Sequence, residues 1–204
     1  MYVSAGWNCH SATEGVRLGL RSRRAEGYKT CPFDEMVTNY KGLAECIRDG
    51  LDPLYDVTQL RLVRAEDSCP FFVTGGKGDL LIVHKKYSFI FNHESPGHAG
   101  LHVSQAWSGG INHYVKDNFR EFRARYARRV SNLKTLFESD QAVNFLLTVP
   151  TPHFEEASST IYKAFYERYE KELRILHIPE PCPETYRIHT ELMSEFGSRA
   201  RAQI

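Results

Sequence analysis

A cysteine near the start of this chain is the first residue whose type and position could do chemistry. Cys9 follows the β-prone residues 2–5 and the turn sequence GWN, and it precedes an amphipathic stretch that predicts a helix. A helix N-terminus stabilises a thiolate, the nucleophilic form of cysteine, and the N–H groups of residues 9–11 could hold a developing oxyanion. Ser11 and Glu14 fit an S-x-x-E capping pattern, which would place Cys9 just outside the helix. The alternative interpretation is a small buried cysteine.

A thiol nucleophile needs a base within hydrogen-bond reach and usually a third group that orients the base. His93 is the candidate base, because it ends a β-rich run and enters a loop rich in Gly, Ser and Pro. Asp34 is the candidate orienting acid, since the sequence PFD holds it in a restricted turn, and Glu94 is a weaker candidate. Structural interpretations stand beside these: His93 could cap a strand, and Asp34 could cap the helix that follows it.

His153 offers a different arrangement. It follows the apolar run 143–149, and a parallel sheet would bring it to the same edge as Cys9. This layout is similar to that of lipase-like hydrolases of the SGNH type, with Cys in place of their Ser, but their late D-x-x-H motif is absent from the sequence. His98 and His102 have a metal-like spacing, but they lack the Glu of H-E-x-x-H, so no metal site is predicted.

Apolar periodicity indicates the elements that position these residues. Continuous apolar runs predict buried strands at 2–6, 143–149 and 173–178, and the helix between the last two makes a βαβ unit with parallel neighbours. A β-hairpin insertion is predicted near 71–92. The expected fold is one three-layer α/β domain over residues 1–204, with a mainly parallel, Rossmann/flavodoxin-like sheet. The predicted helices run from about residue 8–11 to residue 20 and over 39–50, 113–138, 151–172 and 183–196.

An ordered set of short motifs resembles a family of papain-like cysteine peptidases. Members of that family carry G-x-x-C near the N-terminus, then PFDW, then a His at the end of a middle strand, and then an R-Y-x-R-R helix. The similar segments here are GWNCHSA, LGLR, CPFDE, NHE and FRARYARRVSNL, spread over most of residues 2–150. The matching positions are Gly6, Cys9, Pro32, Phe33, Asp34, His93, Arg125, Tyr126, Arg128 and Arg129.

The resemblance implies a catalytic set and a substrate class. It implies a nucleophile at Cys9, a base at His93, an acid at Asp34 and amide bonds as substrates. Glu35 stands where the family usually has Trp, so the packing around Asp34 must differ here. Papain-like folds also set the cysteine helix against an antiparallel β-barrel, whereas residues 143–178 predict parallel strands.

The composition limits the partners that this chain is expected to have. Its 26 basic and 25 acidic residues give a net charge of +1, so nucleic acid is disfavoured as a partner, although the arginine-rich helix could contact phosphate locally. No run approaches the roughly 18 apolar residues of a membrane span, and we expect a cytoplasmic protein. The five cysteines are odd in number and include no CxxC pair, so neither a disulfide framework nor a zinc-ribbon site is expected.

The leading hypothesis from the sequence is therefore a cysteine-dependent hydrolase that needs no cofactor and acts on a peptide or a small acyl substrate. Two alternatives stay open: an SGNH-like esterase that uses His153, and a non-catalytic module that binds an anionic ligand or a partner protein. The residues expected to line the binding site are Asn8, His10, Ser11, His153, Arg125 and Arg129.

Overall fold

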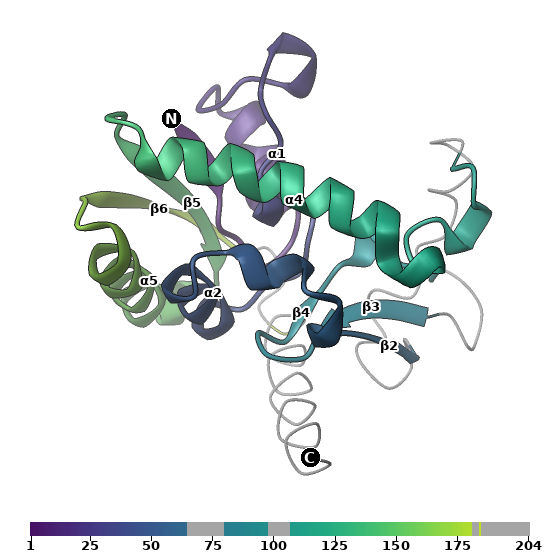
Figure 1. Cartoon of the computed structure of the whole chain (residues 1–204). Coiled ribbons are helices and arrows are strands. Elements are labelled where there is room, and N and C mark those ends of the chain that lie inside the picture. Colours follow the sequence, from purple (N-terminus) through teal and green to yellow (C-terminus); the bar gives the residue numbers. More distant parts are fainter. Residues whose placement is uncertain (65–79, 98–106, 181–183, 185–204) are drawn as a thin grey trace.

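The computed structural model describes residues 1–64, 80–97, 107–180 and 184. The predicted helix over 183–196 falls almost entirely outside these residues, as does the 71–79 part of the predicted hairpin. The helices of the described part are α1 (His10–Arg17), α2 (Tyr40–Arg48), α4 (Lys116–Glu138) and α5 (Phe154–Tyr169) (Figure 1). The strands are β1 (Tyr2–Ser4), β2 (Leu60–Arg64), β3 (Leu80–His84), β4 (Phe89–Ile90), β5 (Val143–Val149) and β6 (Leu173–Pro179).

Three strands form a parallel sheet in the order β1-β5-β6, which confirms the predicted parallel neighbours. Its register pairs Ser4 of β1 with Leu146 of β5, and Leu146 with Leu176 of β6. α1 packs against β1 and β5, and α5 packs against β5 and β6. Because helices cover the central strand β5, almost all of its residues are buried, and this explains its continuous apolar sequence.

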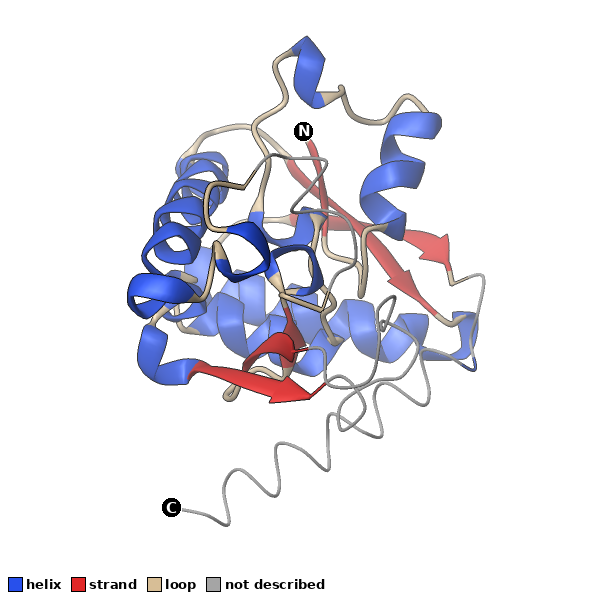
Figure 2. Ribbon diagram, turned by 90° about the vertical axis from the view of Figure 1, so that its right-hand side faces the viewer, coloured by secondary structure: helices blue, strands red, loops and turns tan. Residues whose placement is uncertain are grey.

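A second, antiparallel sheet has the order β2-β3-β4 and lies apart from the first (Figure 2). β3 and β4 form a hairpin inside the predicted 71–92 region, with Val83 opposite Ile90. β2 was not predicted, because its two buried residues, Leu60 and Val63, do not follow the alternation typical of strands. The chain is thus a mixed α/β protein with a parallel sheet and a small antiparallel one.

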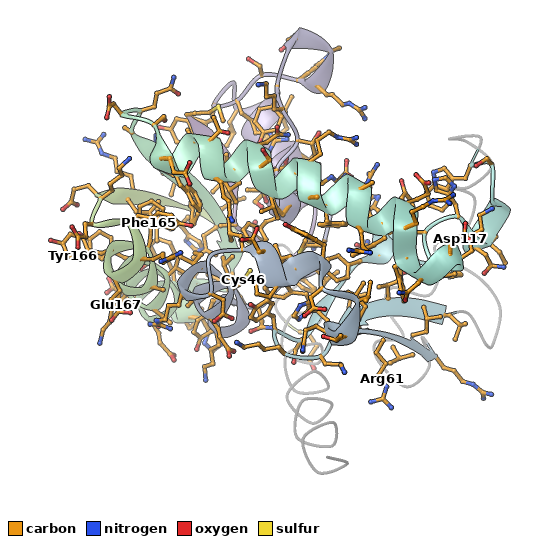
Figure 3. The ribbon with its side chains drawn as sticks, in the orientation of Figure 1. Cys46, Arg61, Asp117, Phe165, Tyr166 and Glu167 are labelled. Carbon is orange, nitrogen blue, oxygen red and sulfur yellow. The ribbon has the colours of Figure 1, made fainter. Side chains whose placement is uncertain are left out.

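α2 lies within the helix predicted over 39–50. Asn39 caps the N-terminus by accepting a hydrogen bond from a main-chain N–H of the first turn, at 2.7 Å. Gly50 follows the helix with φ of 81°, a left-handed conformation that favours glycine. α2 packs against α5, and Figure 3 locates Cys46 of α2 and Phe165 of α5, which are both fully buried. Tyr166, the residue after Phe165, is half exposed on the outer side of α5.

α4 runs across the molecule from the parallel sheet to the antiparallel sheet (Figure 1). Near one end, Phe137 packs on Phe145 of β5, with ring centroids 5.9 Å apart. Near the other end, Phe122 meets Phe91, the residue after β4, at 4.7 Å. The helix therefore ties the two sheets into one hydrophobic core. No helix among the described residues is both long enough and apolar enough to cross a membrane.

Candidate functional site

Cys9 is the N-cap residue of α1, and it is exposed. Its carbonyl oxygen accepts hydrogen bonds from the main-chain N–H and the hydroxyl of Thr13, each at 3.0 Å, so the helix begins at His10. The capping pattern predicted for Ser11 and Glu14 does not form. Ser11 is buried and its Oγ lies 2.6 Å from that of Ser4, while Glu14 forms an ion pair further along the helix.

The environment of Cys9 favours the neutral thiol. Its pKa lies above the ordinary 9.0, because the surrounding protein desolvates the sulfur and the carboxylate of Glu35 repels a thiolate. A hydrogen bond from its own main-chain N–H partly opposes this rise in the pKa. The neutral thiol is therefore the form that this environment favours at neutral pH, whereas the predicted helix start had suggested a thiolate.

His93 lies in a 3₁₀ helix, Asn92–Glu94, that follows β4, and its side chain is half-buried. Burial lowers the pKa of its imidazole below the usual 6.5, and the charges of Arg129 and Arg125 lower it further. The carboxylate of Glu35 acts in the opposite direction and raises this pKa. At neutral pH the ring is therefore uncharged, which is the form that accepts a proton.

Glu35 is an acid that the sequence did not single out. Its charge acts on the Cys9 thiol and on the His93 imidazole, so it lies within electrostatic reach of each. Its carboxylate forms ion pairs with Arg125, at 2.8 Å, and with Arg129. Although burial alone would raise the pKa of Glu35, the two guanidinium groups lower it, so the carboxylate is charged at neutral pH. The one feature of the sequence that drew attention to Glu35 is that the similar family usually has Trp at this position.

Asp34, the acid expected to orient His93, is bound elsewhere. Its side chain is 2 % exposed and accepts hydrogen bonds from Arg21, at 2.6 Å, and from the main-chain N–H of Cys31, at 2.8 Å. The hydroxyl of Tyr28 lies 3.4 Å from the same carboxylate. Asp34 ends a 3₁₀ helix, Pro32–Asp34, and its side chain turns back over that helix. Its side-chain hydrogen bonds and ion pair thus go to residues 21–31.

Glu94 lies at the centre of a buried network. Its side chain is fully buried, and its carboxylate accepts a hydrogen bond from Arg125 at 2.7 Å and lies 3.5 Å from Arg129. Tyr126 donates its hydroxyl proton to the other carboxylate oxygen at 3.1 Å. Together with Glu35, these groups balance two negative charges with two positive ones. Arg125 and Arg129, which were predicted to bind a ligand, are therefore engaged with acids of the chain itself.

The remaining residues predicted around Cys9 shape its loop. Asn8 accepts a hydrogen bond from the main-chain N–H of His10 at 2.7 Å, so this N–H is not free for an oxyanion. The N–H groups of Ser11 and Ala12 belong to the first helical turn and have no acceptor among the described residues. A Cβ added to Gly6 would lie 2.3 Å from Ser11 Oγ, which is why this position needs glycine.

His153 lies at the edge of the sheet that the sequence predicted for it. It ends the 3₁₀ helix Thr151–His153 that follows β5, and it precedes α5. Because β1 and β5 are parallel neighbours, the loops that carry Cys9 and His153 leave the same edge of the sheet. Trp7 and Glu180 also meet at this edge through a hydrogen bond from the indole N–H to the carboxylate.

No cluster of three or more His, Cys, Asp or Glu side chains suitable for a metal ion occurs in the part of the chain that the structure describes. His98, His102, Cys69 and Cys182 lie outside that part, whereas Cys31 and Cys46 are free and buried. In comparisons with known proteins, no family model, no curated protein and no solved structure matches this chain.

Proposed function

We propose that this protein is a cysteine-dependent hydrolase in which Cys9 is the nucleophile, His93 the general base and Glu35 the acid that supports His93. The observation that carries the proposal is the position of one carboxylate, Glu35, which is held by Arg125 at 2.8 Å and whose charge acts on both the thiol and the imidazole. A nucleophile, a base and a charged group that stabilises the base are the parts that acyl transfer requires. The motif resemblance supports the same pair of residues.

The protonation states support general-base catalysis rather than a resting thiolate–imidazolium pair. In the first step, Cys9 Sγ attacks the acyl carbon while His93 takes the thiol proton, and Glu35 stabilises the imidazolium that forms. The N–H groups of Ser11 and Ala12 hold the oxyanion of the tetrahedral intermediate. His93 then gives its proton to the leaving group, and a thioester remains. Water hydrolyses the thioester in a second cycle of the same proton transfers.

The proposal extends to substrate and architecture. The substrate is a peptide or a small acyl compound, and the resemblance favours amides over esters. The finer architecture is three-layered and Rossmann/flavodoxin-like, because Cys9 follows the first strand of a parallel sheet, where doubly wound folds place functional groups.

A second candidate uses His153 as the base, in an SGNH-like layout with Cys9 as the nucleophile. One observation favours it: the loops after β1 and β5 leave the same sheet edge. This candidate predicts ester substrates and gives no role to Glu35. It therefore differs from the first in the roles of three side chains, His93, His153 and Glu35, which substitution can test.

Four variants test the two candidates against a panel of chromogenic esters and fluorogenic peptides. Under the first proposal, Cys9→Ala and His93→Gln abolish turnover, Glu35→Gln lowers it strongly, and the matched control His153→Gln retains it. Loss of turnover in His153→Gln with retention in His93→Gln supports the second candidate instead. A wild-type activity that Cys9→Ala leaves unchanged contradicts both.

A further inference from the structure

The loop that contains residues 24–30 and the middle of α4 enclose a cavity of about 170 Å³. The loop rises beside α4 in Figure 1. The cavity is lined by cationic side chains and by no acidic one. The cations are Arg24, Lys29, Arg125, Arg128 and Arg129, and Asn132 is a neutral residue of the same lining.

Three of these cations lack a counter-charge. Arg125 and Arg129 are neutralised by Glu35 and Glu94. In contrast, Arg24, Lys29 and Arg128 form no ion pair with any acid in the described part of the chain, where the ion pairs involve other residues. Bringing three like charges around one cavity is unfavourable, because each repels the other two. An anion in the cavity would relieve this repulsion.

The walls of the cavity are held in place without a ligand. Asn132 of α4 donates its side-chain N–H to the main-chain oxygen of Thr30 at 3.0 Å, which ties the loop to the helix. Tyr28 is fixed beside it, since the guanidinium of Arg21 stacks 4.0 Å from the centre of the tyrosine ring. Both contacts fix the loop that carries Arg24 and Lys29. A ligand therefore meets a preorganised site, which lowers the entropic cost of binding.

We propose that this cavity binds the phosphate group of a small phosphomonoester. A phosphomonoester carries close to two negative charges at pH 7, which suits three uncompensated cations better than the single charge of a carboxylate does. Guanidinium groups match phosphate oxygens with paired N–H donors. The cavity is smaller than the roughly 300–1,000 Å³ of pockets that enclose drug-sized ligands, so it takes the phosphate and leaves the rest of the molecule outside.

A nucleic acid fits the same observations less well. Single strands are bound along extended basic grooves with aromatic platforms for the bases, whereas this site is one small cavity on a chain of net charge +1. The phosphate site needs no turnover at Cys9. It therefore stands or falls independently of the hydrolase proposal.

Calorimetric titration of the full chain at constant ionic strength tests the site, with inorganic phosphate and phenyl phosphate as probes and acetate as the comparison. We expect saturable binding of one phosphate per chain and weaker binding of acetate. Arg128→Gln and Lys29→Gln should each weaken phosphate binding about tenfold, the size of one lost charge-assisted contact. Arg123→Gln, on α4 but outside the cavity lining, is the matched control and should leave the affinity unchanged.

Three outcomes would overturn the proposal. One is the absence of saturable phosphate binding, and another is an equal loss of affinity in Arg123→Gln and Arg128→Gln. The third is tighter binding of a short single-stranded oligonucleotide, with a steep salt dependence, than of phenyl phosphate. Because Arg24, Lys29 and Arg128 are exposed, their substitution leaves the core intact, and the same variants can be compared by thermal unfolding.

Discussion

Asp34 and Glu35 are neighbours in the chain, but their carboxylates belong to separate networks. Asp34 accepts hydrogen bonds from Arg21 and from the loop before it, whereas Glu35 pairs with the arginines of α4 and acts on the candidate catalytic side chains. Of these two adjacent acids, Asp34 thus fixes a loop, and Glu35 has the role in the candidate site that we propose.

Substitution should separate these two duties. We expect Asp34→Asn to lower the free energy of unfolding by about 3–5 kcal/mol, because it leaves the poorly exposed Arg21 without its counter-charge. Glu35→Gln should instead lower turnover by about 10²- to 10⁴-fold, since the imidazolium of His93 loses its stabilising charge. Urea unfolding and steady-state kinetics of both variants test this. The reverse assignment of effects would contradict it.

The buried network around Glu94 should contribute strongly to stability. Glu94→Gln removes a fully buried negative charge and leaves the guanidinium groups of Arg125 and Arg129 with one acid between them. We expect a loss of about 3–5 kcal/mol in the free energy of unfolding. Glu167→Gln, which breaks an exposed pair with Arg48, is the control and should change little. Equal effects in urea titrations of the two variants would show that burial does not matter here.

The pH dependence of Cys9 alkylation should show the effect of the Glu35 charge on the pKa of the thiol. Because desolvation and the charge of Glu35 raise the pKa of this thiol above 9.0, alkylation by iodoacetamide should be slow at pH 7 and should increase beyond pH 9. Glu35→Gln removes the repelling charge, so the midpoint of the curve of alkylation rate against pH should shift to lower pH. Peptide mapping by mass spectrometry follows Cys9 alone. A midpoint well below pH 9 in the wild type would contradict a raised pKa of the Cys9 thiol.

The decrease of kcat/KM at acid pH should reflect protonation of His93. Burial lowers the pKa of this imidazole, so the ring stays a competent base to a pH below 6.5, and kcat/KM should fall only beneath that value. Since the charge of Glu35 raises this pKa, the residual activity of Glu35→Gln should show an acid limb at still lower pH. Profiles that coincide in the wild type and the variant would rule out the coupling of His93 to Glu35.

His84 should make the fold sensitive to mild acid. Its Nδ1 accepts a hydrogen bond from the N–H of Tyr87 and its Nε2 lies 2.9 Å from the carbonyl of Pro53, an arrangement that requires the neutral ring. Burial lowers its pKa to about 4. The unfolded chain takes up this proton near pH 6.5 and the folded chain does not, so stability is lost as pH falls from about 6.5 toward 4.

The size of that effect follows from proton linkage. The free energy of unfolding should decrease by up to about 1.4 kcal/mol per pH unit across this window as a result of His84 alone. Urea titrations between pH 7.5 and pH 4.5 measure the slope, and His84→Gln should flatten it. An unchanged slope in the variant would assign the acid sensitivity to other groups.

The sequence predicted those parts of the fold that depend on local patterns. The strand at 143–149 was recognisable because a covered parallel strand is apolar along almost its whole length, whereas β6 is apolar enough to be recognised but is only partly buried. α2 was recognisable because Leu43, Cys46 and Ile47 recur at helical spacing before Gly50. β2 was not predicted, because its buried residues Leu60 and Val63 do not follow the every-second-residue spacing typical of strands. Its partner strand, β3, also lies far along the chain.

The site could be predicted only in part, for a related reason. The candidate pair Cys9 and His93 came from position and resemblance, and this pairing stays a prediction. The role of Glu35 depended on which of two adjacent acids faces residues more than fifty positions away, and no local pattern records that choice. The raised pKa of the thiol likewise depends on desolvation by the folded chain, which a helix-start pattern does not contain.

The arrangement of α4 has a consequence for the assembly of this protein. Cys9 comes from the loop after the parallel sheet, and His93 comes from the end of the antiparallel sheet. The aromatic rings at the two ends of α4 join those sheets. Neither sheet alone thus supplies both members of the proposed Cys9–His93 pair, and the proposed chemistry requires the two sheets to be joined.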